Sequence, residues 1–256
     1  MKANNARVQS ERIRDIAIAA RHGLADALAP ILAAQVRQAT LDVESGAGRN
    51  IARHAAVWER QLMEAKHGWA MHFAVDGYRL GEVVTGKSAG LMELLGKDDY
   101  GDPAVLTAVE VTTADALISR RIGMDVARYV AETSKLETAR SINRLSEIFA
   151  RDVAENRTVA EIARDFADEG ASWVSGTGRA NMMARTMSQW AYNHGSMEAY
   201  ADAGAKSEWL ASTDACEPIC LPLNGVIADE GGLFNGQMFT GHPNCQCTVI
   251  PVIPEA

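Results

Sequence analysis

The residues best suited to chemistry lie near the end of the chain, where thiol and imidazole side chains form two short groups. These groups are Cys216-x-x-x-Cys220 and His242-Pro-Asn-Cys245-Gln-Cys247, and they contain all four cysteines of the protein. Thiolates and neutral imidazole are the ligands that zinc prefers, and four of them arranged as a tetrahedron make a structural site. Turn-forming residues around each group allow both groups to converge on one ion. The sequence therefore predicts a metal-clipped module in this region.

The spacing of the five side chains favours some of them as ligands. Cys216 and Cys220 have a spacing typical of zinc knuckles, as do His242 and Cys245. Cys247 lies only two residues after Cys245, and neighbouring ligands of one ion need a backbone turn between them. We therefore expect the first four as ligands, and Cys247 as a substitute ligand or a buried thiol. Two alternatives stay open: disulfides between the two groups, which an oxidising compartment permits, and four reduced, buried thiols.

Composition narrows the class of protein. With 256 residues, of which 47% are hydrophobic, the chain can bury a real core in one large or two small domains. No apolar run reaches the roughly 18 residues that a membrane helix requires, and the polar residues after Met1 do not resemble a signal peptide. We therefore expect a soluble protein that is made in the cytoplasm and does not bind a membrane.

The net charge of −8 is concentrated at the end of the chain. No Lys or Arg follows Lys206, whereas acidic residues accumulate there. They are Glu208, Asp214, Glu217, Asp229, Glu230 and Glu255. Nucleic-acid binding depends on Lys and Arg that neutralise phosphates. The tail is therefore expected to bind protein and not DNA, while contact of the helical part of the chain with DNA stays open.

Apolar residues at helical spacing predict long helices up to about Gly204. Pro30 is expected to kink or divide the first of them. Asn50 is expected to cap the second, which should end near Gly77 or Gly81. These assignments make the greater part of the chain helical.

Residues that favour helix ends indicate where the later helices begin and end. Thr113 is expected to open a long helix, and Thr158 with Glu161 forms a capping box for a short one. A flexible connection containing Gly170 should follow. The next helix, from about 179 to 203, ends at Gly204, where a left-handed cap belongs.

The helix from about 179 to 203 carries Arg185, Gln189 and Asn193 at four-residue steps on one face. A polar stripe of this kind is usually solvated. Here it can instead meet the tail, because the chain turns at Gly204 and must fold back.

Beyond Gly204 the pattern changes to short extended pieces separated by Gly, Pro, Asn and Asp. A module of about 50 residues is near the size at which a metal or a staple becomes necessary. The predicted fold is mainly α, a long helical body with a small C-terminal β- and loop-rich module clipped by Cys and His, and α+β overall. The expected segments are 1–110 (helical), 111–204 (helical) and 205–256 (the module), and the extended pieces are 207–211, 225–227, 234–239 and 248–253.

Catalytic motifs are few. H-E-x-x-H and the deaminase pattern are absent, and a site closed by four soft ligands is structural, so we expect no enzyme activity. A metal-dependent nuclease using His242 with Asp214 or Asp229 is one alternative. Residues 81–88 also fit the spacing of a phosphate loop, which leaves a nucleotide hydrolase using Lys87 as another. Their flanks are predicted to be helical, and we therefore expect a helix-to-helix turn there.

Residues of the last helix and the tail resemble the C-terminal domain of phage head morphogenesis proteins, the Mu protein F-like minor head proteins. The resemblance covers about residues 140–253. Two positions depart from the family pattern, since Gln246 and Met187 stand where relatives usually carry Arg and Glu. The matching positions are Arg185, Thr186, Asn193, Trp209, Asp214, Cys216, Cys220, Leu223, Gly225 and His242-Pro-Asn-Cys245-x-Cys247.

This resemblance implies a minor capsid protein of a tailed bacteriophage, present in the virion in few copies. It would associate with the portal protein or the major capsid protein and act in head assembly or DNA delivery. Around the metal ligands, the framework positions would support the module: Arg185, Asn193, Trp209, Asp214 and Gly225. A third alternative, unrelated to virions, is a cytoplasmic adaptor stapled by zinc.

Overall fold

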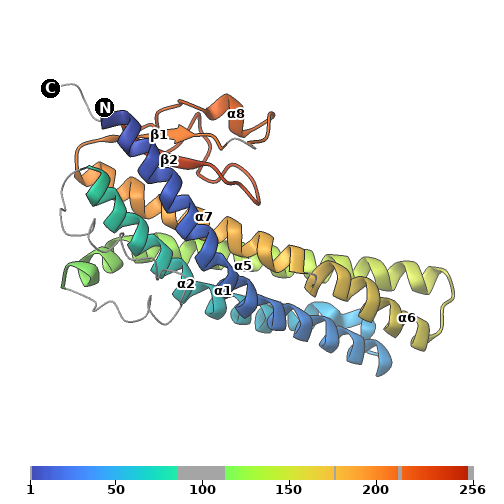
Figure 1. Ribbon diagram of the computed structural model, residues 1–256. Coiled ribbons are helices and arrows are strands. Elements are labelled where there is room, and N and C mark those ends of the chain that lie inside the picture. Colours follow the sequence, from blue (N-terminus) through green and yellow to red (C-terminus); the bar gives the residue numbers. More distant parts are fainter. Residues whose placement is uncertain (1, 86–112, 176, 213–214, 253–256) are drawn as a thin grey trace. The chain divides into compact units, whose positions relative to one another are not determined.

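A computed structural model describes residues 2–85, 113–175, 177–212 and 215–252 (Figure 1). Most of these residues are helical, and one pair of strands lies near the C-terminus, which confirms the predicted fold class. None of the helices in this part of the chain is long and apolar enough to cross a membrane. The elements are α1 (Lys2–Glu44), η1 (Gly48–His54), α2 (Ala55–Val84), α5 (Thr113–Ala154), α6 (Val159–Asp165), η2 (Phe166–Ser175), α7 (Thr177–Asp202), β1 (Lys206–Leu210), α8 (Cys220–Leu223) and β2 (Thr248–Val252).

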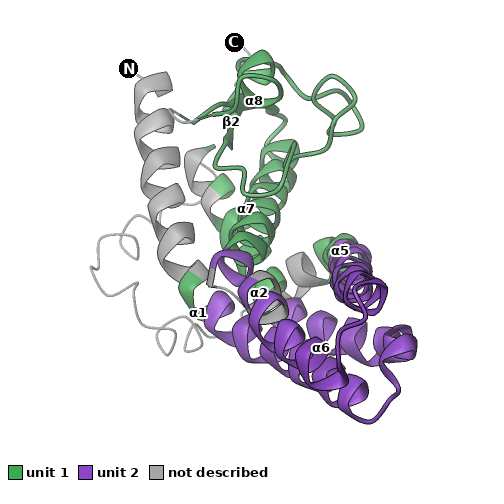
Figure 2. Cartoon of the chain, turned by 90° about the vertical axis from the view of Figure 1, so that its right-hand side faces the viewer, with its two compact units in different colours: residues 1–23, 69–126, 182–256 green, residues 24–68, 127–181 purple. Residues whose placement is uncertain are grey.

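The chain forms two compact units, each built from segments that are distant in sequence (Figure 2). Unit 1 comprises residues 1–23, 69–126 and 182–256, and unit 2 comprises residues 24–68 and 127–181. The helices α1, α2, α5 and α7 therefore each contribute to both units. The sequence predicted three continuous segments with boundaries near residues 110 and 204, and these boundaries stay a prediction.

Pro30 was expected to kink or divide the first helix, and of these two outcomes the division is wrong, as is the predicted cap at Asn50. The helix α1 continues through Pro30 and is not divided there. Proline removes one backbone hydrogen bond, but Leu28 and Leu32 on either side are fully buried and hold the helix in place. Asn50 does not cap α2, because it lies inside the 3-10 helix η1 with φ −120° and ψ 37°.

The predicted end of α2 near Gly77 or Gly81 is also wrong, since the helix runs on to Val84. Both glycines face α7 within unit 1. A Cβ atom on Gly77 would overlap the carbonyl oxygen of Tyr192, and one on Gly81 would lie 2.5 Å from the Cβ of Ala199. The hydroxyl of Ser196 donates to the carbonyl of Gly77 over 2.9 Å. These glycines allow the backbones of α2 and α7 to approach closely, as small residues do wherever helices cross tightly.

Several predicted helix ends are confirmed. The helix α5 begins at Thr113, and Thr158 and Glu161 form the expected capping box of α6. Gly204 follows α7 with φ +73°. The segment containing Gly170 differs from the predicted flexible connection, because it continues α6 as the π-type helix η2.

Unit 2 has an apolar core and a buried ion pair between Lys66 and Glu137. Lys66 is 1% exposed and pairs with the carboxylate of Glu137. Burial lowers the pKa of the Lys66 ammonium, and the charge of Glu137 opposes that shift. One core cluster of this unit consists of Ala39, Val43, Ile51, Trp58, Leu145, Ile148, Ile162, Ala163 and Phe166.

Removing the charge of Glu137 is expected to lower the free energy of unfolding more than removing the charge of Lys66. Glu137→Gln leaves the Lys66 ammonium buried without a counter-charge and should lower the free energy of unfolding by about 2 kcal/mol. Lys66→Met keeps the side-chain volume and leaves a carboxylate that water can reach, so the expected change is within about 1 kcal/mol. Urea denaturation of the two variants measures the difference. Equal losses would show that the buried charge is not the cause.

Candidate metal centre

The tail is organised around β1. This strand pairs antiparallel with β2, with Trp209 opposite Val249. On its other edge the amide of Trp209 donates to Val226 (2.9 Å), and the amide of Gly225 donates to the carbonyl of Trp209 (2.8 Å). Gly225 has φ +82°, a conformation that favours glycine. Figure 1 shows the two strands and α8 beside α7, which belongs to the same unit from residue 182 on.

Aromatic side chains form the core of this module. Trp209 is fully buried, and its ring centroid lies 5.3 Å from that of Phe234 and 4.5 Å from that of Phe239. Three of the cysteines belong to the same core and are at most 1% exposed. The buried members are Tyr200, Trp209, Cys220, Leu223, Phe234, Phe239, Cys245, Cys247 and Val249.

The five predicted donor side chains lie in one cluster. The sulfurs of Cys216 and Cys220 and a ring nitrogen of His242 all lie within 4.8 Å of one another, as do the sulfurs of Cys220, Cys245 and Cys247. Cys220 is common to both sets. Its sulfur is 3.0 Å from Nε2 of His242 and 3.8 Å from the sulfur of Cys245.

The sulfur–sulfur distances are compatible with a metal ion and are longer than a disulfide bond. All four cysteines are free thiols, and the 3.8 Å between the sulfurs of Cys220 and Cys245 far exceeds the ~2.05 Å of a disulfide. Two thiolates bound to one tetrahedral zinc at ~2.3 Å have their sulfurs roughly 3.8 Å apart. The cluster thus has spacings suited to a metal ion.

The ring of His242 is oriented as in many metal-binding histidines. Its Nδ1 lies 2.7 Å from the carbonyl oxygen of Pro243, which can only accept a hydrogen bond, so Nδ1 carries the proton. In the neutral ring, Nε2 then has a free lone pair on the side of Cys220. A backbone carbonyl that fixes the tautomer in this way is a common support for a metal ligand.

Contacts within the cluster lower the pKa of some of its thiols and raise the pKa of others. A hydrogen bond from the thiol of Cys245 lowers the pKa of Cys247 to about 6, and the same bond raises the pKa of Cys245. Burial raises the pKa of Cys220 to about 12. The backbone amide of Cys220 lowers the pKa of Cys216. Because a divalent cation stabilises every thiolate around it, a bound metal would oppose the effects that raise a pKa.

The polar stripe of α7 holds the segment that carries the last two cysteines, as the sequence suggested. Gln189 donates from Nε2 to the carbonyl of Cys247 (2.5 Å). Oδ1 of Asn193 accepts from the amide of Val249 and from the hydroxyl of Thr248, both at 2.9 Å. Asn193 is fully buried. The stripe therefore supports the segment that carries Cys245 and Cys247 and is not solvated at these positions.

Thr186, a position of the family resemblance that was not among the expected supporting residues, makes a third contact of this kind. Its hydroxyl accepts from the amide of Asn244 over 2.8 Å. Its position three residues before Gln189, on the same face, was the available signal. The buried Nε of Arg185 has no hydrogen-bond partner among the described residues, and the supporting role expected of Arg185 stays a prediction. Asp214, the remaining expected support, lies outside the described residues.

Asn193→Ala should lower the free energy of unfolding by about 2 kcal/mol, because the buried amide of Val249 loses its acceptor. Hydrogen exchange at Val249 should become faster together with the loss measured in urea. Asn143 is an exposed asparagine in α5, and Asn143→Ala provides the matched control, with an expected change within about 0.5 kcal/mol. An Asn193→Ala protein as stable as this control would contradict the supporting role.

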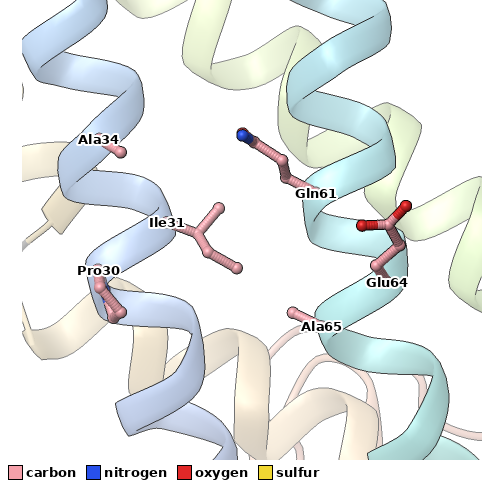
Figure 3. Close-up of a pocket in the computed structure, with 6 residues that line it drawn as sticks. All are labelled: Pro30, Ile31, Ala34, Gln61, Glu64 and Ala65. Carbon is pink, nitrogen blue, oxygen red and sulfur yellow. The ribbon is translucent and has the colours of Figure 1, made fainter.

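Other candidate sites offer less chemistry. A groove between α1 and α2 in unit 2 is lined by one titratable side chain, Glu64, and five that do not titrate (Figure 3). Residues 81–84 belong to the last turn of α2 and are not preceded by the strand that a phosphate loop needs. Lys87 and Ser88 lie outside the described residues. The groove residues are Pro30, Ile31, Ala34, Gln61, Glu64 and Ala65.

No protein-family model, curated protein or solved structure matches this chain. The candidate metal centre is therefore defined by the residues of this chain alone.

Proposed function

We propose that this protein is a non-enzymatic minor head protein of a tailed bacteriophage, whose C-terminal module is clipped by zinc and binds another head protein. The observation that carries the proposal is the convergence of all five Cys and His donors on one cluster supported by α7. The same donors, together with Thr186 and Asn193, are positions of the resemblance to head morphogenesis proteins.

The donor set favours a structural role for the zinc. Cys220, Cys245 and Cys247 are at most 1% exposed, and soft ligands that surround an ion leave no open position for substrate. A nuclease would need a carboxylate at the ion. Asp229 is instead engaged in a turn, where Oδ1 accepts from the amides of Gly231 and Leu233, both at 2.9 Å. These contacts support a clip and disfavour Asp229 as the carboxylate of a nuclease.

The surface of the module supports a protein partner. No Lys or Arg follows Lys206, so the module would repel the phosphates of DNA. Among the module's described residues, three large apolar side chains are exposed: Leu221 (47%), Ile227 (45%) and Met238 (56%). Glu208 lies beside Ile227, because the two residues form a β-bridge. Exposed apolar side chains next to carboxylates suit a basic protein surface, for which the proposed partner is the portal protein or the major capsid protein.

Purified phage particles provide the test. The full-length protein should be present in them in few copies, it should bind the isolated portal or major capsid protein, and this binding should weaken with salt. The double variant Leu221→Asp, Met238→Asp should fold, bind zinc and fail to enter particles.

Two outcomes would replace the proposal. Absence of the wild-type protein from particles would favour the cytoplasmic adaptor. Cleavage of DNA in the presence of a divalent metal, lost in His242→Ala, would favour the nuclease.

A further inference from the structure

The metal centre contains one donor more than a tetrahedral ion can use. Five side chains meet in it, in two sets that share Cys220. A zinc ion takes four ligands in a structural site. One donor must therefore remain outside the first coordination sphere, and the structure differs among the five in ways that identify it.

Burial separates the donors into a central group and two peripheral residues. Cys220, Cys245 and Cys247 are essentially inaccessible, whereas Cys216 and His242 are half-buried. The three buried sulfurs also form one of the two close sets. A buried thiolate without a cation is costly, so these three have the strongest requirement for the ion. The fourth position then belongs to Cys216 or to His242.

The contacts of His242 favour it as the fourth ligand. Its Nδ1 is engaged with the carbonyl of Pro243, and its Nε2 is 3.0 Å from the sulfur of Cys220. The backbone of the next residues is fixed as well, because the amide of Asn244 donates to Thr186. Cys216 differs in position, since it is half-buried and the two residues after it, Glu217 and Pro218, are exposed.

We infer that Cys220, Cys245, Cys247 and His242 hold the zinc, and that Cys216 is a reserve thiolate beside it, which takes the fourth position when His242 is removed. The inference rests on the zinc site proposed above. It differs from the sequence prediction, in which Cys216 was a ligand and Cys247 the substitute. It also makes Cys216 a modification site, because its sulfur can react with an electrophile while the zinc stays bound.

Alkylation of the native, zinc-loaded protein tests the assignment. Iodoacetamide forms a carbon–sulfur bond with a thiolate and releases iodide. In the wild type, peptide mapping should find Cys216 modified at least tenfold faster than the other three cysteines, with one zinc per chain retained. In His242→Ala, Cys216 should become at least tenfold slower, because it now binds the ion.

Zinc content by native mass spectrometry tests the reserve role independently of reactivity. Cys216→Ser and His242→Ala should each keep one zinc per chain, whereas the double variant should lose it, as should Cys220→Ser. Loss of zinc in Cys216→Ser alone, or a wild-type Cys216 as unreactive as the buried cysteines, would overturn the inference while leaving the zinc site intact. A wild-type protein that binds no zinc would overturn the zinc site itself, and the reserve thiolate with it.

Discussion

Cys220→Ser is expected to abolish zinc binding and to unfold the C-terminal module, the largest effect of any single substitution in this protein. The sulfur of Cys220 belongs to both sets of donors and lies in the aromatic core of the module. Structural zinc contributes about 10–16 kcal/mol of apparent binding free energy in small domains, and a module of this size has little core to replace it. Zinc content should fall from one ion per chain to none, and amide exchange in β1 and β2 should become fast.

A matched control is available within the same cluster. Cys216→Ser removes a thiol four residues earlier and should retain both the zinc and the slow exchange of the two strands. Protection of β1 and β2 in Cys220→Ser equal to that in the wild type would contradict the dependence of the module on the ion.

Gly77→Ala is expected to have the second largest effect, a loss of about 3 kcal/mol or more in the free energy of unfolding. The added methyl group would overlap the carbonyl oxygen of Tyr192 on α7. Backbone atoms cannot move aside as the end of a side chain can, so the two helices must separate. The loss also outweighs the gain of up to about 1 kcal/mol that alanine brings to a helix interior. Urea denaturation followed by circular dichroism measures it.

Gly68 provides the control on the same helix. A Cβ atom there would meet nothing within 4 Å, and the residue is exposed, so Gly68→Ala should stabilise the protein by about 0.5–1 kcal/mol. If alanine lowers the free energy of unfolding at Gly77 and raises it at Gly68, close helix packing and not helix propensity accounts for the glycine at position 77. A stabilised Gly77→Ala protein would exclude the contact between α2 and α7.

Most of the features that sequence reasoning predicted correctly are encoded locally. The capping box of Thr158 and Glu161 and the left-handed turn at Gly204 depend on residues within a few positions of each other. The donor side chains were found because few residue types bind zinc. The stripe containing Gln189 and Asn193 was expected to meet the tail because the chain has to reverse after Gly204.

The features that sequence reasoning missed depend on distant contacts. Glycine often marks the end of a helix, which is why α2 was expected to end near Gly77. The helix instead continues through Gly77, where the absence of a side chain lets the backbone of α7 approach. Pro30 breaks a helix by local rules, and buried leucines on both sides hold α1 together. Local spacing also does not reveal that the sulfur of Cys247, expected as a substitute ligand or a buried thiol, lies beside those of Cys220 and Cys245.

The central claim is that zinc clips the C-terminal module through sulfur and nitrogen ligands. X-ray absorption at the zinc edge of the purified full-length protein tests it most directly. The account predicts one zinc per chain with three sulfurs at about 2.3 Å and one nitrogen at about 2.0–2.1 Å. A protein without zinc, or a zinc surrounded only by nitrogen and oxygen, would contradict it.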